Sequence, residues 1–165
     1  MPDIELHLRA DEARLIFLAI AYHLGRPGSE LDPVTKQPVE RGLAEASREL
    51  QPQLRMASAT IHLNNDQLTR LLSGMLGSIT ELKAYPMLEL RPDDEGGRRR
   101  SVPGFDRSLR HLFPAVEEDI DNAMDIAEHM LMLKRRFDER LADLQPEVPG
   151  SPSKERSRRW WPFRH

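Results

Sequence analysis

Hydrophobic and polar residues alternate near the start of the chain, and the same pattern returns later in the sequence. Residues 6–12 read LHLRADE, and residues 61–67, fifty-five positions further on, read IHLNNDQ. In each copy an alternation typical of a half-buried strand leads to an Asp or Asn that can cap a helix, and an apolar helical pattern follows. The pattern therefore predicts two strand-helix units, near residues 4–25 and 59–83.

The helices of the two units are expected to pack against each other. The first should begin at a cap formed by Asp11 and end near Leu24, and residues 15–21 are apolar all round, as in a central helix. The second, capped by Asp66 or Asn65, is interrupted by small residues at 73–74 and 77–78. Small residues inside a helix indicate the close approach of a neighbouring backbone.

Prolines divide the rest of the chain into shorter predicted elements. Pro38 suits the first residue of a surface helix that ends near Leu50, and Pro86 is expected to end the second unit's helix. The segment Met87–Arg91 is then predicted as a third strand. A surface loop over 93–104 and a short helix over 105–113 follow.

A long helix is predicted from Ala115 to about Leu144. Its apolar stripe, spaced by three and four and interrupted at Lys134, consists of Val116, Ile120, Ala123, Ala127, Met130, Phe137, Leu141 and Leu144. The stripe can cover the core formed by the two units, or it can pair with the same helix of a second chain. The apolar run at 130–133 is wide enough for both, so a homodimer is also expected.

Together these elements predict an α+β protein with far more helix than strand. We expect a sheet of two or three strands, with two strand-helix repeats packed under the long C-terminal helix. Residues 1–145 should form a single globular domain, and the proline- and serine-rich segment from 146 should be a flexible linker and tail, 146–165.

Composition narrows the classes of protein that the chain can belong to. The 165 residues include no cysteine, which excludes disulfides, thiolate metal sites and cysteine nucleophiles. The longest apolar run, 15–21, is much shorter than the roughly 20 residues of a membrane-spanning helix. The acidic start lacks the basic leader of a secretory signal. A cytoplasmic location is therefore expected.

Candidate catalytic or metal-binding side chains are few. His7 and His62 occupy equivalent positions of the two copies, but alternation should turn both away from the core, and zinc requires more ligands than two. Asp121, Asp125 and His129 lie four residues apart on one helix face, as metal ligands could. A solvated face that complements the helix dipole is the favoured interpretation of these residues. No glycine-rich phosphate loop and no nucleophilic serine motif is present, so we predict no cofactor.

The C-terminal tail is the better candidate for a binding site. It combines arginines with the densest aromatic cluster of the chain, and the predicted contact residues are Arg158, Arg159, Trp160, Trp161, Phe163 and Arg164. Such residues suit a pocket of a protein partner, an anionic membrane surface or single-stranded nucleic acid. Alternatively, the tail is a disordered terminus whose aromatic side chains fold back onto the body of the protein.

The predicted function is a non-enzymatic cytosolic interaction or adaptor protein that presents this tail to a protein partner or a membrane surface. Two alternatives stay open. One is a metal-dependent hydrolase that uses Asp121, Asp125 and His129. The other is a nucleic-acid-binding regulator that uses the loop arginines 98–100 together with the tail.

Overall fold

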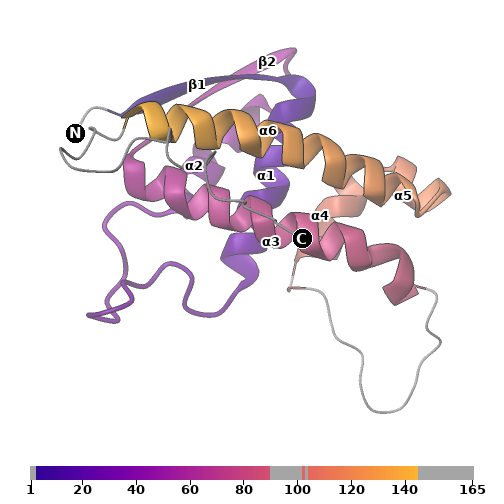
Figure 1. The fold of residues 1–165 in the computed structure, drawn as a ribbon, viewed down its shortest axis with the longest axis horizontal. Coiled ribbons are helices and arrows are strands. Elements are labelled where there is room, and N and C mark those ends of the chain that lie inside the picture. Colours follow the sequence, from indigo (N-terminus) through magenta and orange to yellow (C-terminus); the bar gives the residue numbers. More distant parts are fainter. Residues whose placement is uncertain (1–2, 90–101, 103, 145–165) are drawn as a thin grey trace, which may run out of the picture.

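The computed structural model describes residues 3–89, 102 and 104–144. In chain order the elements are β1 (Ile4–Arg9), α1 (Ala10–Gly25), α2 (Leu43–Leu50), η1 (Gln51–Gln53), β2 (Ser58–Leu63), α3 (Asn65–Glu89), α4 (Phe105–Leu112), α5 (Ala115–Glu118) and α6 (Asn122–Leu144). Figure 1 shows α3 and α6 side by side and antiparallel, with α1 crossing behind them and the two strands along the upper edge of the view. The predicted, mainly helical α+β fold is confirmed. None of the described helices is long and apolar enough to cross a membrane.

The sheet is a short antiparallel pair. The register runs from Ile4 opposite Leu63 to Arg9 opposite Ser58. Alternate residues of both strands, Ile4, Leu6, Leu8, Ala59, Ile61 and Leu63, are buried, and the intervening side chains face outward. This period of two places one face of the sheet on the helices, as the alternation predicted.

Both strands lead directly into a helix, but the caps differ from those expected at Asp11 in the first unit and at Asp66 or Asn65 in the second. In the first unit the Glu12 carboxylate accepts the Arg9 N–H at 3.0 Å. In the second, the Asn64 side chain accepts the Gln67 N–H at 2.8 Å, and the Gln67 side chain accepts the Asn64 N–H at 2.9 Å. The predicted caps were therefore wrong, by two positions in the first unit and by one or two in the second, because a side chain three residues after the cap reaches back to close each helix start.

Helices α1 and α3 approach closely at Gly74, as the small residues predicted. A Cβ atom at this position would lie 2.8 Å from the Ala19 carbonyl oxygen and 3.3 Å from the His23 Cβ atom. The neighbouring Ser78 is fully buried, and its hydroxyl donates to the Gly74 carbonyl at 2.8 Å. The absence of a side chain at Gly74 is what lets the two backbones meet.

The predicted single helix from 115 to 144 is divided into α5 and α6. Asp119 has extended backbone angles after α5, and its carboxylate accepts the Asp121 N–H at 2.9 Å. This local bond offers the backbone an alternative to the helix. From residue 122 onward the chain is helical again.

The apolar stripe of α6 has no polar interruption. Leu133 is buried and fills the place in the stripe where Lys134 was expected to interrupt it. The Lys134 ammonium instead pairs with Asp138 at 2.7 Å. The buried stripe residues pack mainly on α3, so the stripe covers the protein's own core. The dimer predicted through the same helix stays a prediction.

Two proline-based predictions were wrong. Pro38 lies in an isolated bridge with Leu31, and α2 starts only at Leu43. Its first amides, those of Leu43 and Ala44, donate to the Glu30 carboxylate at 3.2 and 3.4 Å. A carboxylate from the preceding loop thus caps this helix.

Pro86 lies inside α3, which continues to Glu89. Residues 87–89 of the predicted third strand are therefore helical, and the rest of that strand lies outside the described residues. Just before the proline, the buried Tyr85 donates its hydroxyl hydrogen bond to Asp106 of α4. This tertiary contact anchors the helix at the point where the sequence predicted its end.

Candidate functional site

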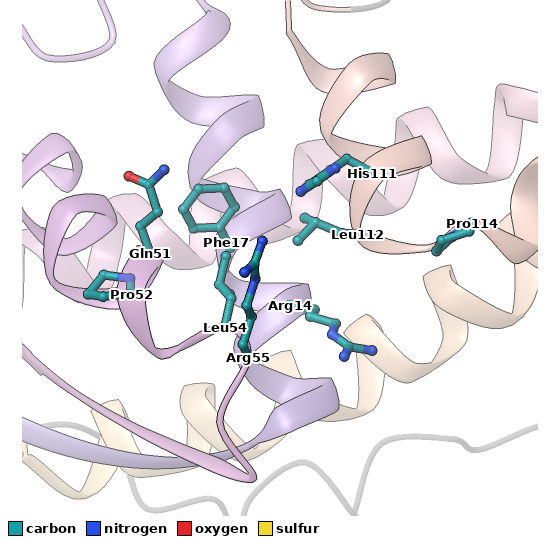
Figure 2. A pocket seen from close by; sticks show the side chains of 9 residues that line it. All are labelled: Arg14, Phe17, Gln51, Pro52, Leu54, Arg55, His111, Leu112 and Pro114. Atoms are coloured by element: carbon teal, nitrogen blue, oxygen red, sulfur yellow. The ribbon is translucent and has the colours of Figure 1, made fainter.

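A hollow of about 640 Å³ lies where α1, the segment from η1 onward and the end of α4 meet. Its lining residues, labelled in Figure 2, are Arg14, Phe17, Gln51, Pro52, Leu54, Arg55, His111, Leu112 and Pro114. The volume is typical of a ligand-binding pocket. Because the three segments are distant in sequence, the hollow exists only in the folded chain.

The floor of the pocket is apolar. Phe17 and Leu54 are half-buried and pack against the core, and Leu112 is buried at the last turn of α4. Phe17 points into the hollow from α1 and faces the side chains of the η1 segment (Figure 2). A ligand with an apolar group can therefore remove hydrophobic surface from water here.

The rim of the pocket is cationic. Arg14, Arg55 and His111 are exposed and come from three different segments. No lining residue is acidic, and in the described part of the chain none of these three side chains has an ion pair with a carboxylate. The two arginine side chains are therefore exposed to solvent without a carboxylate partner among the described residues.

Two arginines elsewhere in the fold, Arg41 and Arg136, are paired with carboxylates. Arg41 binds Asp3 at 2.9 Å and Glu45 at 3.2 Å, and these hydrogen bonds raise the pKa of Arg41. The Arg136 guanidinium lies 2.5 Å from the buried Glu12 carboxylate, which ties α6 to the start of α1. Pairing of this kind satisfies the charge of these two arginines within the fold, whereas Arg14 and Arg55 have no such partner among the described residues.

A second, polar hollow lies beside the loop after α1, lined by His23, Arg26, Pro27, Gly28, Ser29, Thr69, Arg70 and Ser73. Its charged groups have structural roles. The buried His23 contacts the Glu30 carboxylate at 2.8 Å, and Arg70 donates to the Ser29 carbonyl at 2.9 Å. Since Glu30 also caps α2, these contacts hold the 26–42 loop in place.

The twin histidines lie on the outer face of the sheet and form no shared site. His7 is opposite Thr60, and its ring contacts the Thr60 hydroxyl at 3.2 Å. His62 pairs with Glu49 of α2 at 2.8 Å, and this hydrogen bond raises the pKa of His62. Each histidine thus has its own neighbours.

The acidic candidates of the long helix do not line either of the two hollows described above. Asp121 lies in the break before α6, whereas Asp125 and His129 are exposed on α6 itself. Among the residues that the structure describes, no three His, Asp or Glu side chains are close enough to hold one metal ion. The other candidates, arginines 98–100 and the tail contacts at 158–164, lie outside the described residues.

Sequence reasoning did not find the pocket. Phe17 was counted among the apolar residues of a central helix, and Arg14, Arg55 and His111 were not identified as candidates. The one available signal was an aromatic residue three positions after an arginine on an otherwise apolar helix, which indicates a partly exposed edge. The contributions of Arg55 and His111 had no local signal, because they depend on how η1 and α4 pack on α1.

Comparisons with models of protein families, with curated proteins and with solved structures gave no match.

Proposed function

We propose that this chain is a non-enzymatic cytosolic interaction protein that binds an acidic, partly apolar segment of a partner protein in the α1–η1–α4 pocket. The observation behind the proposal is the combination of two uncompensated arginines with an apolar floor. Carboxylates of the ligand would pair with Arg14 and Arg55, while an apolar side chain would cover Phe17 and Leu54.

The chemistry of the pocket favours binding over catalysis. Its lining combines cations and apolar groups without a paired nucleophile and base, and His111 has no described hydrogen-bond partner that would orient its ring. General acid–base or covalent catalysis depends on such positioned pairs. A rim of fixed positive charge instead supplies electrostatic steering and selectivity for acidic partners.

Fluorescence anisotropy with a synthetic peptide of alternating Glu and Leu tests this proposal. We expect the peptide to bind the full chain and to lose affinity when Gln replaces Glu, and again when Ser replaces Leu. Arg14→Glu and Arg55→Glu should each weaken binding about tenfold, because attraction becomes repulsion at the rim. Added salt should reduce the same affinity.

Arg107→Glu is the matched control, because this exposed arginine is on α4 but does not line the pocket. It changes the net charge by the same amount as the two pocket variants. Equal weakening by Arg107→Glu, or equal binding of the Gln-substituted peptide, would contradict a specific site.

The tail predicted to contact a partner or an anionic membrane is a separate proposal, supported by its sequence alone. Its basic character makes it a poor ligand for a basic pocket, so the two contacts would serve different partners. The full chain with Trp160→Ala and Trp161→Ala should sediment less with phosphatidylserine vesicles than the native chain does. Unchanged sedimentation would remove the membrane as the tail's target.

A further inference from the structure

The two outer edges of the sheet differ in whether their outward-facing backbone groups are hydrogen-bonded. On β2, the Gln53 side chain donates to the Thr60 carbonyl and accepts the Thr60 N–H, both at 2.9 Å. The Glu49 carboxylate accepts the His62 N–H at 3.4 Å. Side chains of α2 and η1 thus occupy the positions of a neighbouring strand, and this edge is closed.

The outer edge of β1 is open. Thr60 and His62 turn their backbone groups away from β1, so their partners in the register, His7 and Glu5, turn theirs away from β2. Within the described residues, the N–H and C=O groups of Glu5 and His7 have no hydrogen-bond partner. The next residue that turns its backbone outward is Arg9, and its N–H donates to the Glu12 carboxylate.

We infer that β1 pairs with β1 of a second copy of this chain, antiparallel and with His7 on the twofold axis, to form a four-stranded sheet. The Glu5 and His7 donors of each copy would then meet carbonyl groups of the other. This contact goes beyond the proposed function, because it lies on a different face and requires no ligand.

Charge complementarity selects a second copy as the occupant. With His7 on the axis, Glu5 of each chain is opposite Arg9 of the other, so two cross-strand ion pairs form on the exposed face. On the inner face the same register places Leu6 opposite Leu8 of the second copy. Charged side chains on an edge discourage pairing with unrelated strands, whereas this order of charges is complementary to itself.

The chain's own C-terminal segment fits the edge less well. It contains Pro146, Pro149 and Pro152, and a proline cannot donate to a strand ladder. Its remaining charges are mainly basic, so they would not reproduce the alternation of Glu5 and Arg9. A second β1 supplies both the hydrogen bonds and the matching charges.

A single-cysteine cross-link tests the register, because the native chain has no cysteine. Two residues facing each other on the axis have Cα atoms about 5.5 Å apart, within reach of a disulfide. Mild oxidation of His7→Cys should therefore give a covalent dimer on a non-reducing gel. Thr60→Cys, on the same face but on β2, is the control, since its two copies would be roughly 14 Å apart, three strand spacings.

Charge reversal tests the pairing without a cross-link. Glu5→Arg and Arg9→Glu should each raise the dimer dissociation constant about tenfold, because two attractive pairs become repulsive. A mixture of the two variants should recover dimerisation, since every pair is then complementary. This recovery separates the contact from any local effect of Arg9→Glu on the start of α1.

Light scattering of the native chain over a concentration series completes the test. We expect a dimer that dissociates on dilution. A native chain that stays monomeric at all concentrations, equal cross-linking of the two cysteine variants, or failure of the mixture to recover would each overturn the inference. A dimer that is insensitive to both charge reversals would place the contact elsewhere, including α6.

Discussion

The two strand-helix units begin with nearly the same pattern and differ in what surrounds them. Glu12 and Gln67 occupy equivalent positions, both are buried, and each closes the start of its helix. Glu12 also binds Arg136 of α6, whereas the Gln67 amide donates to the Gly42 carbonyl at 3.0 Å. The local cap is therefore common to both units, and the charge of the capping side chain matches the neighbour that it meets.

The outward-facing residues of the two units also differ in what surrounds them. Arg14 and Phe17 of α1 line the pocket, while the equivalent residues of α3 are Thr69 and the buried Leu72. On the sheet, β1 has an open edge and β2 a closed one. The first unit thus carries both proposed contact surfaces, and the second is enclosed by α2, η1 and α6.

Changing the charge of the capping side chain should have the largest effect on the free energy of unfolding. Gln67→Glu places a carboxylate against the Gly42 carbonyl in a fully buried site, and we expect a loss of about 3 kcal/mol in the free energy of unfolding. Glu12→Gln keeps an acceptor for the Arg9 N–H and leaves an arginine that reaches solvent, so it should cost only about 1 kcal/mol. Urea denaturation measures both, and equal losses would contradict the matching of charge to neighbour.

The close approach of the two unit helices should be the next most sensitive feature. Gly74→Ala forces a methyl group against the Ala19 carbonyl oxygen, and we expect a loss of about 2 kcal/mol from overpacking. Ser73→Ala, at the exposed neighbouring position, is the control and should change stability little. Thermal unfolding of the two variants checks this, and a Gly74→Ala protein as stable as the control would show that α1 and α3 can separate without cost.

Opening the β2 edge should have a smaller effect. Gln53→Ala removes the side chain that pairs with both backbone groups of Thr60. Water can replace part of this pairing, so we expect a loss of about 1 kcal/mol. The amide hydrogen of Thr60 should exchange faster with solvent. Gln51→Ala, in the same turn, is the control, because the Gln51 side chain has no hydrogen bond to another described residue. Unchanged exchange at Thr60 after Gln53→Ala would contradict a closed edge.

The smallest predicted difference concerns pH. The hydrogen bond that His62 makes to the Glu49 carboxylate raises the pKa of His62 above its ordinary value of 6.5. A raised folded-state pKa stabilises the protein at pH values below the unfolded pKa, and this contribution is lost as the pH rises through the folded pKa. Glu49→Gln should therefore lower the pKa of His62 in an NMR titration and flatten the decline of stability over that window.

His7→Gln serves as the control for the pH prediction, because His7 lies on the same face without contact to Glu49. The slope of stability against pH should persist in this variant. Loss of the slope in His7→Gln, or its persistence in Glu49→Gln, would assign the pH dependence to another group.

From the sequence alone, we could predict the elements that depend on interactions between residues close together in the chain. Alternation of apolar residues placed β1 and β2, and the small residues around Gly74 indicated where two backbones meet. Each of these signals acts within a few residues or on one face of an element. The fold class and the two strand-helix units followed from them.

Tertiary contacts determine where a helix starts or ends when the local sequence predicts another position. They also determine which side chains share a site. Helix α3 continues past Pro86 beside the contact of Tyr85 with α4, and α2 starts where Glu30, thirteen residues earlier in the preceding loop, reaches its first amides. The pocket joins Arg14, Arg55 and His111 from three segments. Because packing energy and the pairing of charges depend on neighbours far apart in the chain, no local pattern could specify them.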